Sequence, residues 1–94
     1  DIETIQKIVA NHFNLNLQEM LSARRSRSLA RPRQIAMYLS KQQTTNSLPD
    51  IGRKFSNRDH TTVIHAVKKI ETLIIKDNEI KQNVEEIKNK LLKN

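Results

Sequence analysis

Four short polar residues, Asp59-His60-Thr61-Thr62, stand between a polar turn and a strongly apolar helical pattern. Asp59 is a good helix N-cap, which would place the other three residues in the first turn of the following helix. Carboxylate, imidazole and hydroxyl groups at such an end suit hydrogen bonds to base edges or to phosphates. Taken alone, the same residues are better explained by Asp59 acting only as a cap.

Arginine dominates the neighbouring chemistry. Residues 24–33 contain five arginines and no acid. Such runs are usually solvated surface, but five arginines without partners repel one another, so a missing anion is the better explanation. A planar guanidinium can enter the narrow minor groove of DNA, while other arginines hold phosphates. We therefore read residues 22–31 as a basic loop that contacts a nucleic acid.

The distribution of charge supports this reading. The net charge is +7, yet residues 1–19 carry −2 and residues 71–94 carry none. Residues 20–70 carry +9, from eleven lysines and arginines against Asp50 and Asp59. An ordinary solvated surface would spread this excess, so the sequence favours binding to a polyanion. Beside this charge, the polar turn at Asp59 is better read as a contact surface than as a simple cap.

The remaining composition excludes several classes. The 94 residues contain no cysteine, which excludes disulfides and thiolate metal sites. No apolar run approaches the roughly 20 residues that a membrane span needs. Phe13, Tyr38 and Phe55 fall at or near core positions, which leaves no aromatic platform for stacking single-stranded bases and favours duplex DNA. The chain does not begin with Met, and we expect it to be one domain, residues 1–94, of a longer protein.

Neither a metal site nor catalysis is expected from the histidines. His60 and His65 would lie about 140° apart around a helix, which does not suit a shared metal. His12 is expected at the surface or as a cap of the first helix. Asp59 and His60 are sequence neighbours, which do not face each other on a helix, and no nucleophile or glycine-rich phosphate loop accompanies them.

Helical spacing of apolar residues predicts the elements that position these side chains. Predicted helices cover residues 2–13, 17–21, 32–43 and 48–55, with Pro32 in the first turn of the third. The two last helices begin after caps at Asp59 and at Asp77 or Asn78. Each carries a core stripe of four residues at i, i+4, i+7 and i+11: Val63, Val67, Ile70 and Ile74; then Ile80, Val84, Ile87 and Leu91.

The pair formed by helix 48–55 and the helix after Asp59, joined by a tight turn, is a helix-turn-helix arrangement. Gly52 falls where the two backbones must approach closely. The predicted fold is thus an all-α helical bundle that contains a helix-turn-helix and a basic loop, of Trp-repressor-like type. In this arrangement the second helix of the pair reads the major groove.

Three segments closely resemble the C-terminal DNA-binding domain of the bacterial DnaA replication-initiator family. They are residues 26–39 (SRSLARPRQIAMYL), residues 47–52 (SLPDIG) and residues 58–66 (RDHTTVIHA). The resemblance covers essentially the whole chain, and both content and spacing match. It implies binding of asymmetric DnaA boxes of the TTATNCACA type at a replication origin, without enzymatic activity in this domain.

The resemblance also implies roles for individual residues. Arg25 would read the minor groove, and four residues would contact bases in the major groove: Asp59, His60, Thr61 and Ala66. The DNA backbone contacts predicted here and from the charge pattern are Arg27, Arg33, Gln34, Lys41, Leu48, Pro49, Arg58, Thr62, His65 and Lys69. Ala23 departs from a position that is often basic in relatives, and Ser56-Asn57 replaces a frequent Gly-Gly.

For the parent protein, the resemblance implies an ATP-binding AAA+ domain, oligomerisation on DNA and a nucleoid-associated place in the cytoplasm. Acidic phospholipids are a further candidate partner. The domain itself is expected to need no cofactor and to be monomeric, because an asymmetric box requires no two-fold axis.

Three alternatives remain open from the sequence. Nonspecific DNA or RNA binding would act through charge with little sequence preference. An interaction module or acidic-membrane binder is weaker, because the charge lies in a loop and at a helix start rather than along one amphipathic helix. An enzyme has the least support.

Overall fold

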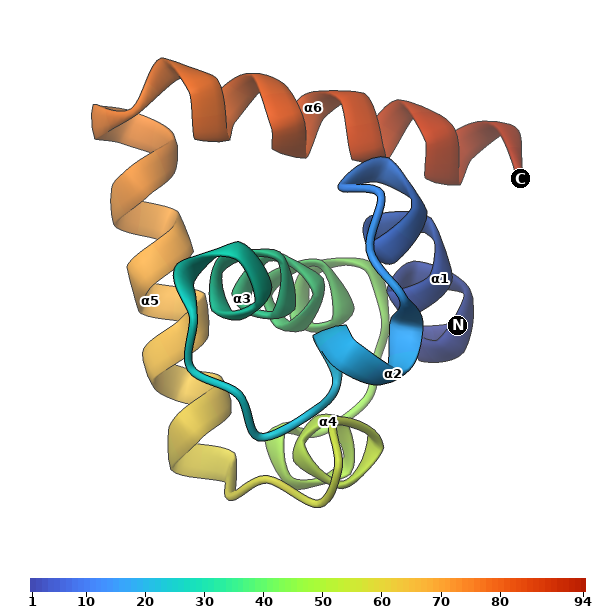
Figure 1. The fold of residues 1–94 in the computed structure, drawn as a ribbon, viewed down its shortest axis with the longest axis vertical. Coiled ribbons are helices and arrows are strands. Elements are labelled where there is room, and N and C mark those ends of the chain that lie inside the picture. The colour runs from blue at the N-terminus through green and yellow to red at the C-terminus, as the bar shows by residue number, and fades with distance from the viewer.

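The computed structural model describes all 94 residues as six helices without a strand (Figure 1). This confirms the predicted all-α class. The helices are α1 (Ile2–His12), α2 (Leu17–Met20), α3 (Arg27–Gln43), α4 (Leu48–Lys54), α5 (His60–Lys76) and α6 (Asn78–Lys93). None of these helices has the length and apolar character that a membrane crossing would require.

Side-chain caps set most helix starts, as local sequence rules require. Asn16 Oδ1 accepts from the Glu19 amide at 3.2 Å, and Ser47 Oγ accepts from the Asp50 amide at 3.2 Å. Asp77 Oδ1 accepts from the amides of Glu79 and Ile80, which makes Asp77 the cap of α6. The predicted caps at these positions are confirmed.

The helices enclose one hydrophobic cluster of 16 buried residues. Figure 1 shows α3 in the middle, with α5, α4 and α1 around it and α6 across one end. The predicted stripes of α5 and α6 supply Val63, Ile70, Val84 and Ile87 to the buried cluster, while their other members pack against it. Phe55 is fully buried, and Phe13 and Tyr38 are partly buried, so the aromatic side chains do belong to the core.

The start of α3 differs from the prediction. Pro32 lies inside the helix, which begins at Arg27 with Ser26 as its cap residue, so the expected loop over residues 22–31 is wrong beyond residue 26. Leu29 is buried, and the amides of Leu29 and Ala30 bond to the Ser26 carbonyl at 3.0 and 2.8 Å. Burial of Leu29 thus extends the helix by one turn and a half, although Pro32 removes one backbone donor from it.

The expectation that His12 is a surface or capping residue is also wrong. Its side chain is 8% exposed, because α6 folds back across α1. Its Nε2 lies 2.9 Å from Asn83 Oδ1, and its Nδ1 lies 2.8 Å from Lys90 Nζ. His12 therefore joins the first and last helices.

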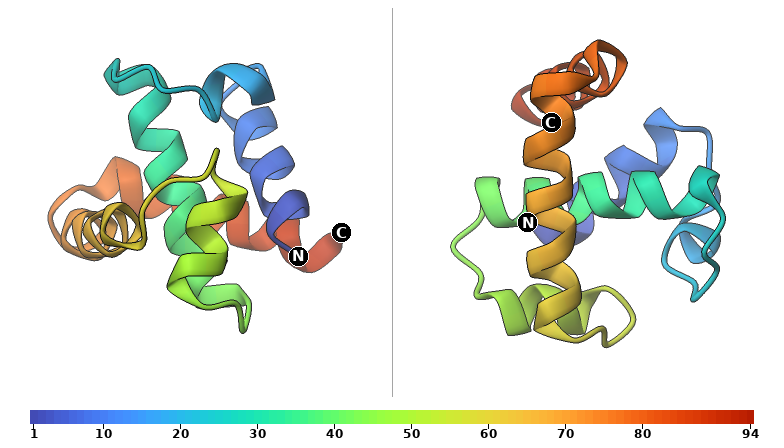
Figure 2. Two further views of the ribbon diagram at one scale, coloured as in Figure 1. Left: turned by 90° about the horizontal axis from the view of Figure 1, so that it is seen from below. Right: turned by 90° about the vertical axis from the view of Figure 1, so that its left-hand side faces the viewer.

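The helix-turn-helix consists of α4, the turn at residues 55–59 and α5. The steep crossing of α5 over α3, with α4 against the first half of α5, is visible in the right-hand view of Figure 2. A Cβ placed on Gly52 would lie 2.2 Å from the Arg58 carbonyl oxygen, and the Arg58 amide donates to the Gly52 carbonyl at 2.8 Å. The predicted close approach at Gly52 is confirmed.

Candidate nucleic-acid interface

The first turn of α5 presents an exposed row of polar side chains. Asp59, the N-cap, accepts from the Thr61 amide at 3.4 Å, and His60, Thr61 and Thr62 are all exposed. His60 Nδ1 also lies 2.9 Å from Asp59 Oδ1, so the expectation that these two neighbours do not pair is wrong. Asp59 has an extended backbone outside the helix, which lets its side chain turn back toward His60.

The environment of Asp59 favours its charged form. Hydrogen bonds from Thr61, followed by the charge of His60, lower the pKa of this carboxyl below its ordinary value. The carboxyl therefore has a higher pKa in the unfolded chain, and its contribution to stability is complete above that value.

We expect this contribution to disappear as the pH falls below about 4, through the folded pKa of Asp59. Free energies of unfolding from urea titrations between pH 6 and 2.5 test this. Asp59→Asn, which keeps a capping oxygen, should show a shallower loss of stability with acid. Identical pH profiles for the two proteins would contradict a role of the Asp59 charge.

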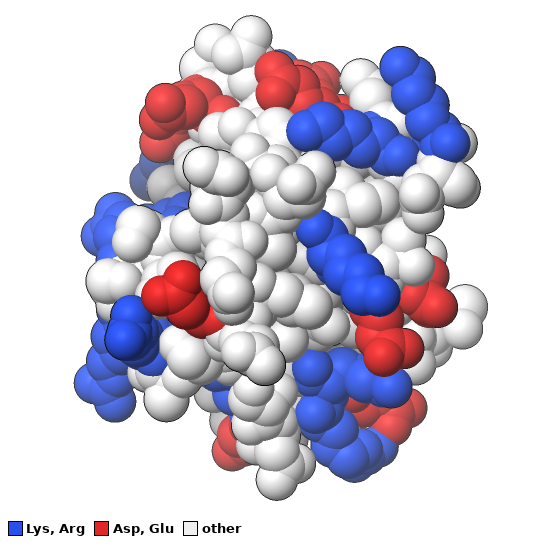
Figure 3. Space-filling view, turned by 45° about the vertical axis from the view of Figure 1, so that its right-hand side comes forward, with Lys and Arg blue, Asp and Glu red and all other residues white.

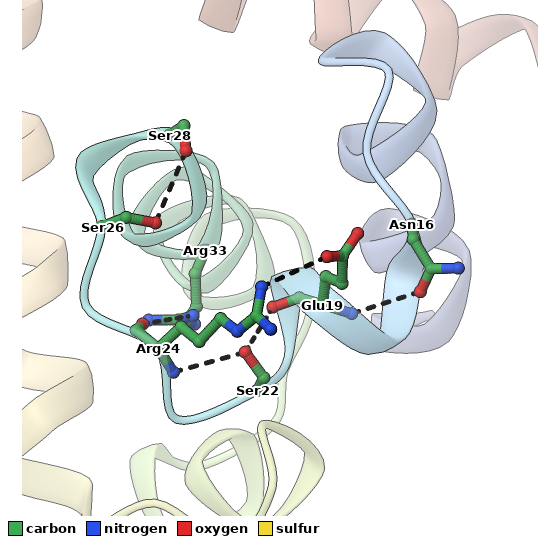
Figure 4. Close-up of polar contacts among 7 residues, drawn as sticks. All are labelled: Asn16, Glu19, Ser22, Arg24, Ser26, Ser28 and Arg33. Carbon is green, nitrogen blue, oxygen red and sulfur yellow. Dashed lines mark hydrogen bonds and ion pairs between the residues drawn. The ribbon is translucent and has the colours of Figure 1, made fainter.

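The basic loop, residues 22–26, connects α2 to α3 and lies beside the α4–α5 turn. Figure 4 shows the Arg24 side chain turned toward Glu19, with Arg24 Nη1 3.4 Å from Glu19 Oε2. Arg25 is exposed and makes neither a hydrogen bond nor an ion pair. Of the two arginines in the loop, Arg25 is the one without a partner in the domain, whereas Arg24 makes an exposed ion pair.

Arg33 and Arg58 lie beneath this loop. Arg33 is 7% exposed and donates from Nε to the Met20 carbonyl at 2.7 Å. Arg58 Nη1 donates to the carbonyls of Leu21 and Phe55 at 3.1 and 2.8 Å. Burial lowers the pKa of both guanidinium groups, and the nearby charge of Arg58 lowers the pKa of Arg33 further. The sequence-based expectation of unpartnered arginines within residues 24–33 is therefore wrong for Arg33, whose partners are backbone carbonyls.

Two adjoining hollows share Arg33, Arg58 and Thr62. One, of about 310 Å³, lies between α3 and α5, and the other, of about 370 Å³, lies under the basic loop. The first is also lined by Ala30, Gln34, Met37, His65, Ala66 and Lys69, and the second by Ala23, Arg25 and Ser56. Neither hollow contains an acidic residue, so both attract anions.

These hollows, with Asp59, His60 and Thr61 at the start of α5, form what we call the recognition surface. It gathers most of the residues singled out from the sequence. Four of them belong neither to the hollows nor to the start of α5: Arg27, Lys41, Leu48 and Pro49. Arg27 instead lines a third depression, of about 600 Å³, which also contains Asp77 and Glu79.

Other parts of the surface carry both signs of charge. On the side of the molecule shown in Figure 3, lysines and arginines are interspersed with aspartates and glutamates. The linings of the two hollows, which contain no acid, differ from this mixture of charges.

No group of three histidine, aspartate or glutamate side chains is placed to hold a metal ion.

Sequence reasoning noted Ser56 only as a departure in the turn. The structure gives Ser56 and Asn57 φ values of 58° each, in the left-handed region. Ser56 Oγ donates to the Leu21 carbonyl at 2.7 Å, across 35 residues of sequence. The sequence indicated only that Ser56 occupies a position that favours glycine. It did not show that the Ser56 hydroxyl bonds to the Leu21 carbonyl.

The chain is similar to known replication initiators. Residues 2–70 match the family described as bacterial dnaA protein helix-turn-helix. The chain is 55% identical over 87 residues to the chromosomal replication initiator protein DnaA of Brucella abortus, and 58% identical over 84 residues to that of Mesorhizobium japonicum. These matches cover 93% and 89% of this chain.

Both matches involve only a part of the relatives, because the chain spans 18% and 17% of their lengths. A crystal structure of a DNA replication initiation factor has a TM-score of 0.82 and 34% identity, over 95% of this chain and 27% of that one. The match to the family spans most of the chain and includes α4, the turn and α5 as far as Ile70. The chain therefore belongs to the bacterial DnaA helix-turn-helix family.

Proposed function

We propose that this chain binds double-stranded DNA in a sequence-specific manner, at boxes of the TTATNCACA type, and takes part in the initiation of chromosomal replication. The observation that carries the proposal is the recognition surface. It combines acid-free hollows, an exposed polar first turn on α5 and the unpaired Arg25 beside them. Membership of the DnaA family supports the identity of the box.

In this proposal α5 enters the major groove. Asp59 accepts from a base amino group, His60 and Thr61 contact base edges, and Ala66 meets a thymine methyl group. Arg25 reads the minor groove, where negative potential is concentrated.

Contacts with phosphates on either side of these grooves hold the domain in register on the duplex. Gln34, Thr62, His65 and Lys69 contact them from the first hollow, beside Arg33 and Arg58. Arg27 and Lys41 contact phosphates from α3, and Leu48 and Pro49 contact them through main-chain groups at the start of α4.

The proposal gives this domain no enzymatic role and no cofactor of its own, and treats it as a monomer. ATP binding, oligomerisation on DNA and contact with acidic phospholipids belong to the proposed parent protein. Its place would be the cytoplasm, on the nucleoid.

Fluorescence anisotropy with a labelled TTATCCACA duplex and a scrambled duplex of equal composition tests the function. We expect a preference for the box of about 10³ or more, the usual range for specific binders. Near-equal binding that collapses with salt would instead support a nonspecific, phosphate-directed binder. Undiminished binding to anionic vesicles in the presence of box DNA would favour the membrane alternative.

The division between base and phosphate contacts gives a second prediction. Arg25→Ala, His60→Ala and Thr61→Ala should each cost about 1–3 kcal/mol on the box and reduce its preference over scrambled DNA. Lys69→Ala should weaken both duplexes equally, because a phosphate contact carries no sequence information. Equal losses on both duplexes for all four variants would refute this division.

A further inference from the structure

We propose that Arg33, Ser56 and Arg58 are positioning residues that fix the basic loop to the α4–α5 turn, so that Arg25 and α5 reach the two grooves in one register. We call these three residues the loop anchor. This inference rests on the proposed function. It gives Arg33 and Arg58 roles inside the protein that differ from the phosphate contacts predicted from sequence.

The loop has little structure of its own. Residues 24–26 belong to no helix or turn, and the bonds made by the loop itself are local. Ser22 Oγ bonds to the Glu19 carbonyl at 2.7 Å and to the Arg24 amide at 3.3 Å. The Arg25 side chain makes no hydrogen bond or ion pair that would orient it. A loop of this kind samples many conformations unless other parts of the chain hold it.

The loop anchor restrains the loop through hydrogen bonds from two other parts of the chain, the α4–α5 turn and α3. From the turn, Ser56 Oγ donates to the Leu21 carbonyl, and Arg58 donates to the carbonyls of Leu21 and Ser22. From α3, Arg33 donates to the Met20 carbonyl and, at 3.0 Å, to the Arg24 carbonyl (Figure 4). Four carbonyls on both sides of Ala23 are thereby fixed, immediately before Arg25.

The chemistry of Arg58 favours positioning over phosphate binding. Three of its five N–H groups point to the carbonyls of Leu21, Ser22 and Phe55. The planar fork of arginine can hold three carbonyls in a fixed geometry, whereas a lysine ammonium cannot reproduce it.

Ser56 gives a separate line of support. A left-handed backbone is unfavourable for a residue with a Cβ, and glycine would relieve it. The Ser56 hydroxyl, however, bonds to the loop, which a glycine cannot do. The serine thus has a structural reason to occupy a position where glycine would be the easier choice.

Base analogues in the duplex allow the two grooves to be probed separately. Replacing adenines one at a time by 2,6-diaminopurine adds an amino group to the minor groove and leaves the major-groove edge unchanged. Replacing thymines by uracil removes the methyl group from the major groove alone. Binding of each duplex would be measured for the unmodified domain and for Arg25→Ala, which identifies the positions that report on the minor-groove contact.

The test variants are Arg58→Lys, which keeps the charge but not the fork, and Ser56→Ala, which removes one hydroxyl. Arg53→Lys is the matched control, because Arg53 is exposed and pairs only with Asp50. Circular dichroism and thermal melts verify that each variant is folded. Ser56→Ala keeps the test decisive if Arg58→Lys does not fold.

We expect the unmodified domain to lose about tenfold in affinity when a diaminopurine lies at the Arg25 position. In Arg58→Lys and Ser56→Ala this penalty should fall by about threefold or more, while the uracil penalty stays within about twofold of its original value. Arg58→Lys should add little to the loss caused by Arg25→Ala, since both act through one contact. Arg53→Lys should leave both penalties unchanged.

Two outcomes would overturn the inference and leave the proposed function intact. One is an unchanged diaminopurine penalty in folded Arg58→Lys and Ser56→Ala. The other is an equal reduction of the diaminopurine and uracil penalties. If the unmodified domain does not prefer the box over scrambled DNA, the proposed function itself fails. The two failures are therefore distinguishable in one set of titrations.

Discussion

Substitution of Gly52 by alanine is expected to lower the free energy of unfolding by about 3 kcal/mol or more. The new Cβ would lie 2.2 Å from the carbonyl oxygen of Arg58, which is backbone and cannot rotate away. Alanine has a higher helix propensity than glycine by about 1 kcal/mol, but the clash outweighs this gain. Relief would require the turn to move off α4 and to break the bond between the Arg58 amide and the Gly52 carbonyl.

Urea unfolding followed by circular dichroism measures this effect. Lys54→Ala is a suitable control, because it also creates an alanine in α4 but removes only an exposed side chain. It should change the free energy of unfolding by no more than about 0.5 kcal/mol. A Gly52→Ala variant as stable as the unmodified domain would mean that the turn does not pack closely against α4 at Gly52.

Raising the salt concentration from about 50 to 200 mM is expected to weaken binding to the box by roughly 40- to 150-fold. This range corresponds to three or four lysine and arginine side chains that neutralise phosphates, each contributing about 0.9 to the slope of log affinity against log salt. Arg27, Lys41 and Lys69 are the cations proposed for this role, with Arg25 in the minor groove as a fourth. Condensed counterions released from the duplex provide the driving force.

Anisotropy titrations at four salt concentrations give the slope directly. Lys69→Ala should reduce its magnitude by about one, because one phosphate contact is lost. His60→Ala should leave the slope unchanged while lowering affinity for the box. A slope near one for the unmodified domain would show that phosphate contacts are few, and most of the proposed backbone set would have to be withdrawn.

Helix caps and core stripes were predictable because each depends on residues close together in sequence. A cap such as Ser47 bonds to an amide three residues away, and the stripe from Val63 to Ile74 repeats along a single helix. The close approach at Gly52 could be anticipated for a related reason: a short turn returns the chain over the helix that precedes it.

Two features that sequence reasoning missed depend on partners far away along the chain. Pro32 suggested a helix start, but burial of Leu29 against the folded domain carries α3 back to Arg27. His12 lies at the end of a helix and was expected near solvent, yet α6 covers it from more than 70 residues away. In both cases tertiary packing outweighs a local signal.

The sequence by itself determined the all-α class, the helix-turn-helix and the concentration of positive charge around it, because composition and periodicity are local properties. Only the tertiary structure decided which arginines are free. Arg33 and Arg58 donate to carbonyls of residues 20–24, whereas Arg25 remains exposed. Formal charge is the same for all three, but buried donors must find acceptors, and those acceptors are brought within reach only when α2, α3 and the α4–α5 turn meet.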